Sequence, residues 1–120
     1  MADQKIPIIL NLIAALVGAA GQYFYKKGGV ILASGGKFFN LPTIVGIVLF
    51  CIVMLFFVLA YKMGGKISIV YPFYATTFVW GALIGYLFEK EPFNLLGFVG
   101  LLLVVAGVSV MAVSLAKSIS

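Results

Sequence analysis

The chain has 120 residues, of which 64% are hydrophobic and only 9% are charged, and its mean hydropathy is +1.24. A soluble domain carries about a quarter charged residues, so this composition excludes an ordinary soluble protein and indicates an integral membrane protein. The net charge is +5, but all eight basic residues are lysines near the ends of apolar stretches, where they can reach lipid head groups, so we expect no nucleic-acid partner.

Four hydrophobic stretches account for nearly all of the chain. They cover residues 6–25, 41–61, 68–88 and 93–115, and each is close to the roughly 20 residues that a membrane-spanning helix needs. We therefore predict one domain, residues 1–120, that is an all-α membrane protein with four transmembrane helices in an up-down-up-down bundle. The first stretch could instead be a signal peptide, but its apolar run is longer than a typical h-region. We expect a multi-pass protein of the inner (plasma) membrane.

Short polar segments separate the four stretches. Residues 26–29 (Lys-Lys-Gly-Gly) are expected to end the first helix, and a loop leads from there to Pro42 in the first turn of the second helix. Residues 62–66 form the second connection and residues 89–92 the third, with Pro92 placed to open the last helix. Because the connections are short, consecutive helices should be antiparallel neighbours.

The lysines are divided evenly between the two sides of such a bundle. Four lie on one side and four on the other: Lys5, Lys62, Lys66 and Lys117 against Lys26, Lys27, Lys37 and Lys90. Since lysine bias sets orientation, an even count predicts insertion in both directions and an antiparallel homodimer, which forms an inverted repeat. The alternatives are that small proteins often have weak bias, or that Lys26 lies in a cavity and does not count.

Polar side chains in the first stretch recur with helical spacing. Steps of four, three, four and four place five residues on one face: Asn11, Ala15, Gly18, Gln22 and Lys26. Amide side chains are costly against lipid, so Asn11 and Gln22 predict a hydrated cavity on this face. The alternative for Lys26 is ordinary snorkelling to the membrane surface beside Lys27.

The third and fourth stretches carry stripes of a different kind. The stripe of the third stretch has aromatic residues at one end and glycines at the other. The stripe of the fourth has mostly small residues, which are suited to close helix contact. The stripes are Tyr71, Tyr74, Phe78, Gly81 and Gly85 in the third, and Gly97, Gly100, Val104, Gly107, Met111 and Ser114 in the fourth. Such stripes are usually plain packing seams. Pro72 lacks an amide hydrogen and can free a carbonyl one turn earlier for a ligand or for movement.

Several segments, taken in order, resemble a known family over the whole chain. They are residues 21–28 (GQYFYKKG), 59–63 (LAYKM), 69–72 (IVYP), 88–92 (FEKEP), 94–97 (NLLG) and 106–108 (AGV). The chain resembles a four-span EamA-type member of the drug/metabolite transporter superfamily. The interval from Gly100 to Gly107 is similar to the glycine pair that small multidrug resistance proteins use in fourth-helix dimer contacts. The resemblance implies an antiparallel homodimeric transporter with substrate between the first three helices of each protomer.

One departure from that resemblance bears on the substrate. Small multidrug resistance proteins carry a membrane-embedded glutamate in the first helix, whereas the region near Gly18 has no acid, and Asp3, Glu89 and Glu91 lie outside the spans. A proton-coupled exporter of cations therefore lacks its carboxylate. The polar side chains that remain are those of Asn11, Gln22, Lys26, Tyr71 and Tyr74. This set favours an anionic or neutral polar solute, or the head group of a lipid-linked sugar phosphate of the kind that similar four-span members flip.

We therefore predict a transporter that works by alternating access on a small-molecule or lipid-linked substrate. The predicted substrate-binding residues are Asn11, Gly18, Gln22, Lys26, Tyr71, Tyr74 and Phe78, and the predicted dimer contacts are Gly100 and Gly107. The alternatives are a small multidrug efflux transporter and a non-transporting membrane assembly protein, and the dimer partner is either a second copy or a paralogous chain. No enzyme activity, cofactor or metal site is expected, because no span contains histidine, aspartate or glutamate and Cys51 has no base near it in sequence.

Overall fold

The computed structural model describes the backbone of residues 4–119 and the side chains of residues 4–114, and every regular element in this part of the chain is helical. The elements are α1 (Lys5–Ala33), α2 (Leu41–Lys62), α3 (Ile67–Val70), the 3₁₀ helix η1 (Tyr71–Thr76), α4 (Thr77–Phe88) and α5 (Leu95–Ile119). Four segments are long and apolar enough to cross a bilayer: Lys5–Ala33, Leu41–Lys62, Ile67–Phe88 and Leu95–Ser114. The prediction of an all-α protein with four such helices is confirmed.

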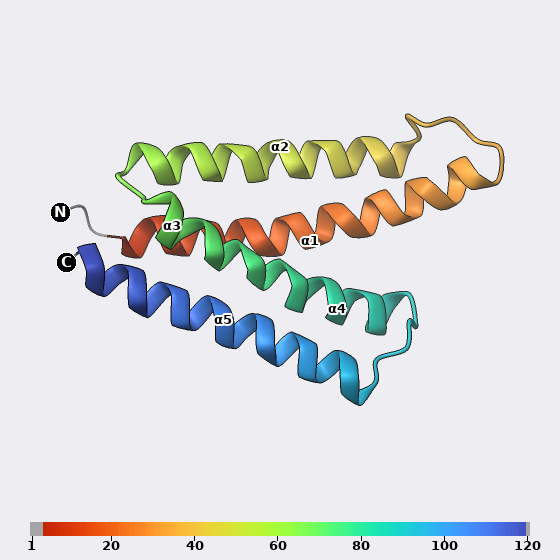
Figure 1. The fold of residues 1–120 in the computed structure, drawn as a ribbon. Coiled ribbons are helices and arrows are strands. Elements are labelled where there is room, and N and C mark those ends of the chain that lie inside the picture. Colours follow the sequence, from red (N-terminus) through yellow and green to blue (C-terminus); the bar gives the residue numbers. More distant parts are fainter. Residues whose placement is uncertain (1–3, 120) are drawn as a thin grey trace.

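The first helix, α1, lies at the centre of the arrangement. Figure 1 shows α1 and α2 lying side by side, while the segment from α3 to α4 follows another side of α1. Helix α5 lies beyond this segment and contacts α3 and η1. The start of α1, the connection from α2 to α3 and the end of α5 lie at one end of the molecule, and the other two connections lie toward the opposite end (Figure 1).

Small residues let α1 and α2 approach closely. The buried hydrophobic residues of this pair are mostly alanines: Ala14, Ala15, Ala19, Val53 and Ala60. Gly21 lies against the ring of Phe50, and Gly46 lies against the ring of Tyr25. The rings of Tyr25 and Phe50 stack on each other with centroids 5.2 Å apart. Close packing of this kind is what holds helices together in lipid, where apolar burial gives no driving force.

Large apolar side chains point outward on all four long segments. Examples are Ile9, Leu16, Val48, Leu55, Leu83 and Leu103. Helix α5 is the extreme case, since no residue in its most apolar window is buried within the chain. An apolar protein surface of this extent would be unfavourable in contact with water. The four segments therefore have the length and the surface of a multi-pass membrane protein.

The first helix is longer than the sequence indicates. The expectation that residues 26–29 end it is wrong, because α1 continues to Ala33. The neighbouring helix supports this glycine-containing turn: the Asn40 side chain donates a hydrogen bond to the carbonyl of Gly28 at 3.0 Å. The helix stops instead where Gly35 adopts a φ of 93°, a left-handed conformation that favours glycine.

The spacing of lysines along α1 matches a membrane thickness. At 1.5 Å per residue, the distance along the axis from Lys5 to Lys26 is about 32 Å, close to the roughly 30 Å of a hydrocarbon core. The last turns of α1 extend beyond this interval. Lys26 and Lys27 therefore occupy the level at which one membrane surface is expected.

The third span is continuous in sequence but changes its helical geometry. The predicted range 68–88 corresponds to α3, η1 and α4 together, which cover residues 67–88. Pro72 lies near the start of the 3₁₀ segment and has no amide hydrogen to donate to the Ser68 carbonyl one turn earlier. A 3₁₀ stretch inside a long helix alters the directions in which its side chains project.

Side-chain caps set two of the helix starts. The side-chain oxygen of Asn40 accepts a hydrogen bond from the Thr43 amide at 3.0 Å and caps α2, and the expected Pro42 does lie in the first turn of that helix. The expectation that Pro92 opens the last helix is wrong, because α5 starts at Leu95. The reason is that the side-chain oxygen of Asn94 accepts a hydrogen bond from the Gly97 amide at 2.9 Å, which satisfies one of the free donors of the first turn.

Candidate functional site

The largest cavity near the predicted polar stripe lies between α1 and the segment η1–α4, with one wall from α2. Its volume is about 540 Å³, and its lining residues are Ala19, Gln22, Phe50, Tyr74, Thr77, Phe78, Gly81 and Ala82. Three of the predicted substrate-binding residues, Gln22, Tyr74 and Phe78, thus meet in one place. An amide, a phenol and a threonine hydroxyl give the otherwise apolar wall three polar groups. We call this the main cavity.

Gly18 is close to the main cavity but has a different part in it. The hydroxyl of Tyr74 lies against Gly18, where any Cβ would meet it. On its other side the Tyr74 ring packs against Phe57 of α2, with centroids 5.0 Å apart. Gly18 therefore leaves space for Tyr74 between α1 and α2. In this position Tyr74 lines the main cavity.

Two other predicted residues lie away from the main cavity. Asn11 is completely buried; its side-chain nitrogen donates to the Pro7 carbonyl at 3.4 Å, and its side-chain oxygen has no hydrogen-bond partner among the described residues. Tyr71 is 56% exposed and packs edge-on against Phe57 at 5.8 Å. Neither is among the residues that line the main cavity.

A second cavity of about 140 Å³ continues from the main one toward the end of α4. Its lining residues are Ala19, Gln22, Tyr23, Lys26, Gly81, Ile84, Gly85, Glu89 and Glu91. The two cavities share Ala19, Gln22 and Gly81 and therefore adjoin each other between α1 and α4; we call them together the groove. We call the second part the outer cavity. Lys26 is thus a further predicted substrate-binding residue that lines the same groove as Gln22.

Charged residues surround the outer end of this groove. The Lys26 ammonium donates to Glu91 Oε2 at 3.0 Å, and Lys27 Nζ lies 3.5 Å from Glu89 Oε2. The Lys27 ammonium also lies over the Tyr23 ring, 5.3 Å from its centroid. This cluster contains two lysines and two glutamates, Lys26, Lys27, Glu89 and Glu91, so its formal charges cancel near the expected membrane surface.

The backbone after α4 holds the two glutamates in place. The amide groups of Glu89 and Glu91 both donate to the Gly85 carbonyl, at 3.2 Å and 3.0 Å. Between them Lys90 adopts a φ of 54°, which is uncommon for a residue with a side chain and turns the chain back toward α4. The carboxylate of Glu91 then lies against Gly85, in space that a Cβ would fill.

In the sequence, Glu89 and Glu91 are identified only as acids of the connection after the third span. Their position outside the helices is confirmed, but the ion pairs with Lys26 and Lys27 are not foreseen. A signal for them is present in the pattern: in an up-down-up-down bundle the ends of the first and third helices lie at the same level. A Lys-Lys pair at one end and a Glu-x-Glu segment at the other would then face each other.

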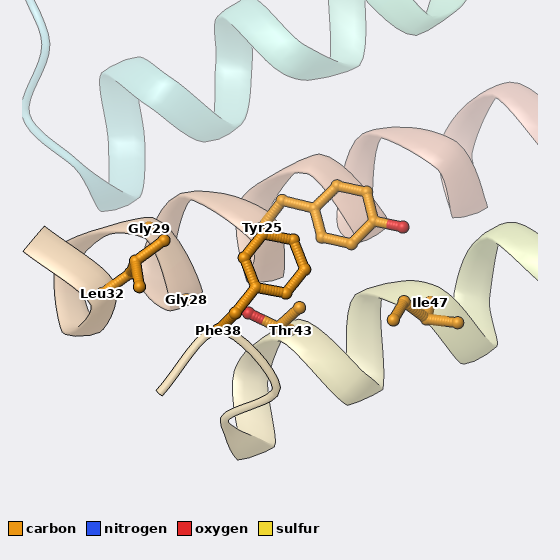
Figure 2. Close-up of a pocket in the computed structure, with 7 residues that line it drawn as sticks. All are labelled: Tyr25, Gly28, Gly29, Leu32, Phe38, Thr43 and Ile47. Carbon is orange, nitrogen blue, oxygen red and sulfur yellow. The ribbon is translucent and has the colours of Figure 1, made fainter. Parts of the chain in front are cut away.

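Another pocket lies outside the predicted stripe. Figure 2 shows it where the end of α1 meets the start of α2, and its volume is about 280 Å³. Its lining residues are Tyr25, Gly28, Gly29, Leu32, Phe38, Thr43 and Ile47, so only one phenol and one hydroxyl interrupt an apolar wall. This pocket lacks the charged and amide groups of the groove and is a weaker candidate for recognising a polar solute.

The predicted dimer contacts, Gly100 and Gly107, face away from the rest of the chain. A Cβ at either position would find no atom within 4 Å beyond the backbone of α5 itself. The small-residue stripe at these positions is therefore not a packing seam within the described chain. The face is available to a second molecule or to lipid.

No family model matches the sequence, and comparisons with curated proteins and with solved structures give no match. The groove and the surface of α5 are therefore the features of the molecule that bear on its function.

Proposed function

We propose that this chain is a four-span EamA-type carrier of the drug/metabolite transporter superfamily. It moves a small polar or anionic metabolite, or a lipid-linked sugar phosphate, across the inner (plasma) membrane by alternating access. The observation that carries the proposal is the groove between α1 and α4, in which Gln22, Tyr74 and Lys26 line two adjoining cavities. Polar side chains within membrane-spanning helices usually face a substrate pathway, because lipid cannot satisfy their hydrogen bonds.

The size and chemistry of the groove support a solute with a polar body and an anionic end. A volume of about 540 Å³ falls within the roughly 300–1,000 Å³ that small-molecule sites occupy. Gln22 lies one helical turn before Lys26 on the same face of α1, so an anion near the lysine would bring the attached polar body to the amide. Tyr74 and Phe78 offer aromatic faces farther along the groove.

The proposed working unit is an antiparallel homodimer of up-down-up-down bundles. The even division of lysines supports insertion in both directions, and the unoccupied space around Gly100 and Gly107 supports contact through α5. In such a dimer the two copies form an inverted repeat, the arrangement with which many carriers open a site to each side in turn.

The groove gives less support to a proton-coupled multidrug pump. Helix α1 contains no carboxylate, and the two carboxylates at the groove already pair with lysines. An organic cation would have to displace a lysine ammonium at the outer end of the groove, and no acid near the middle of α1 could take up a proton in exchange.

Reconstitution into liposomes tests the proposal. Purified protein in phosphatidylethanolamine–phosphatidylglycerol vesicles should exchange at least one radiolabelled compound from a panel of sugar phosphates and other polar metabolites. Gln22→Leu should abolish this flux, while the lipid-facing control Leu16→Met should retain it. Normal flux in Gln22→Leu would reject the groove as the pathway. Acid-driven flux of organic cations would favour the multidrug alternative, and a lack of flux throughout would favour the assembly protein.

A further inference from the structure

The pair between Lys26 and Glu91 is placed where it would meet any solute in the groove. Both residues line the outer cavity, and Gln22 lines both cavities. Their side chains are 51% and 52% exposed, so water reaches the pair. An ion pair this exposed contributes little to folding stability and can exchange its partners readily.

The backbone of Glu91 does not depend on Lys26 for its position. Its amide is bound to the Gly85 carbonyl, and its carboxylate rests against the same glycine, which leaves room for it on α4. The backbone of Glu91 is therefore fixed beside the groove, with its carboxylate in contact with Gly85 and paired with Lys26. The long, flexible side chain of Lys26 is the partner that can move.

We propose that Glu91 is an internal counter-ion for Lys26. It neutralises the lysine while the groove is empty, and the anionic group of an entering solute replaces it. This inference rests on the proposed function, because it concerns the same groove. It also makes Glu91 a specificity-determining residue: only an anion that binds an ammonium better than a nearby carboxylate does, such as a doubly charged phosphate, can take its place.

The neighbouring pair supplies a matched control. Lys27 binds Glu89 and the Tyr23 ring and does not line the outer cavity. The Glu89 side chain is only 18% exposed. Glu89 lines the outer cavity as Glu91 does, so Glu89→Gln removes the same formal charge from the same wall. The two variants differ in the lysine they release, since Lys27 does not line that cavity.

The test uses one cysteine as a reporter inside the groove. Gly81 lines both cavities, and a side chain there has open space, so Gly81→Cys can be placed in the full chain with Cys51→Ala as background. Its rate of reaction is measured with an anionic thiosulfonate (2-sulfonatoethyl) and a cationic one (2-trimethylammonioethyl). The ratio of the two rates reports how readily the groove accepts an anion.

Glu91→Gln should raise the anionic-to-cationic rate ratio by about threefold or more, since it frees the ammonium of Lys26. Glu89→Gln should change the ratio less. The decisive comparison is with Lys26→Met: in that background Glu91→Gln should have little further effect, because no lysine remains to be released. Glucose 6-phosphate should slow the labelling of the reporter at a lower concentration in Glu91→Gln than in the parent.

Additive effects of Lys26→Met and Glu91→Gln would overturn the counter-ion role, since they would show only a general field of charges. Equal effects of Glu89→Gln and Glu91→Gln would also overturn it. The reagents need no transported solute, so the result is separable from the transport proposal. Coupling without flux would reject the carrier and keep the counter-ion, whereas flux without coupling would do the reverse. Gel filtration of each variant checks that it remains folded.

Discussion

The hydroxyl of Tyr74 lies against Gly18, in the space that any larger residue at that position would need. This contact joins the predicted polar face of α1 to the 3₁₀ segment of the third span. It lets Tyr74 fit between Gly18 and the Phe57 ring while still lining the main cavity. The position of the Tyr74 phenol in the groove thus depends on α1 having a glycine, with no side chain, at position 18.

Gly18→Ala should therefore disturb the groove without removing any polar group. The added methyl must displace Tyr74, at a cost of about 1–3 kcal/mol in unfolding free energy, and solute flux should fall. Thermal unfolding in detergent and liposome flux measure the two effects. Tyr74→Phe in the Gly18→Ala background should recover part of the stability, because the nearest remaining ring atom is 3.1 Å from the new Cβ. Unchanged flux in Gly18→Ala would argue against this contact.

Accessibility to water should divide the polar stripe of α1 in two. In a Cys51→Ala background, Gln22→Cys should react rapidly with water-soluble thiol reagents, since Gln22 lines both cavities. Asn11→Cys should react slowly because Asn11 is completely buried, and Leu16→Cys should be protected by lipid. Rapid labelling at position 11 would show that the groove extends farther along α1 than the two cavities do.

The number and kind of helices follow from composition and length, since only helices of about 20 apolar residues suit a chain like this one. The helix ends are less predictable. Residues 26–29 contain lysines and glycines that usually mark a break, but tertiary contact overrides them: Asn40 binds the Gly28 carbonyl, and α1 continues. Asn94 likewise determines the start of α5 in place of Pro92, a choice that depends on side-chain geometry.

For the site, periodicity places residues on a face but does not say what that face meets. Gln22 and Tyr74 do line one cavity, as polar residues on facing helices should. Asn11 lies on the same face but is sealed within the packing, because burial changes along a helix as its neighbours change. The ion pairs of Glu89 and Glu91 require knowing which helix ends adjoin, which is a property of the assembled bundle.

The even lysine count predicts that the carboxyl terminus lies on both sides of the membrane. Reporters that are active on only one side, fused to that terminus, should each give a signal. Adding two lysines to the connection between α4 and α5, with Glu89 and Glu91 unchanged, should shift the population to a single orientation. Activity from one reporter alone in the parent chain would contradict dual insertion and, with it, the antiparallel homodimer.

Replacing Gly100 and Gly107 together with leucine should convert a dimer in detergent to monomer. A Cβ at either position would meet no atom within 4 Å among the described residues beyond the backbone of α5, so added bulk there is directed away from the protomer's own packing. The fold of each protomer should therefore persist while close approach of two α5 helices is blocked. Light scattering after gel filtration measures the mass, and cross-linking in membranes checks it before extraction.

The control for this pair adds bulk elsewhere on the same helix. Val105→Leu enlarges an exposed residue of α5 that lies off the stripe formed by Gly100 and Gly107, so it should leave the dimer intact. If both variants remain dimeric, the protomers meet through another face, and the open space around the two glycines is filled by lipid. If both become monomeric, α5 tolerates no added bulk, and the glycines have no special part in the contact. Only loss of the dimer in the glycine variant, with its retention in Val105→Leu, supports close packing at these positions.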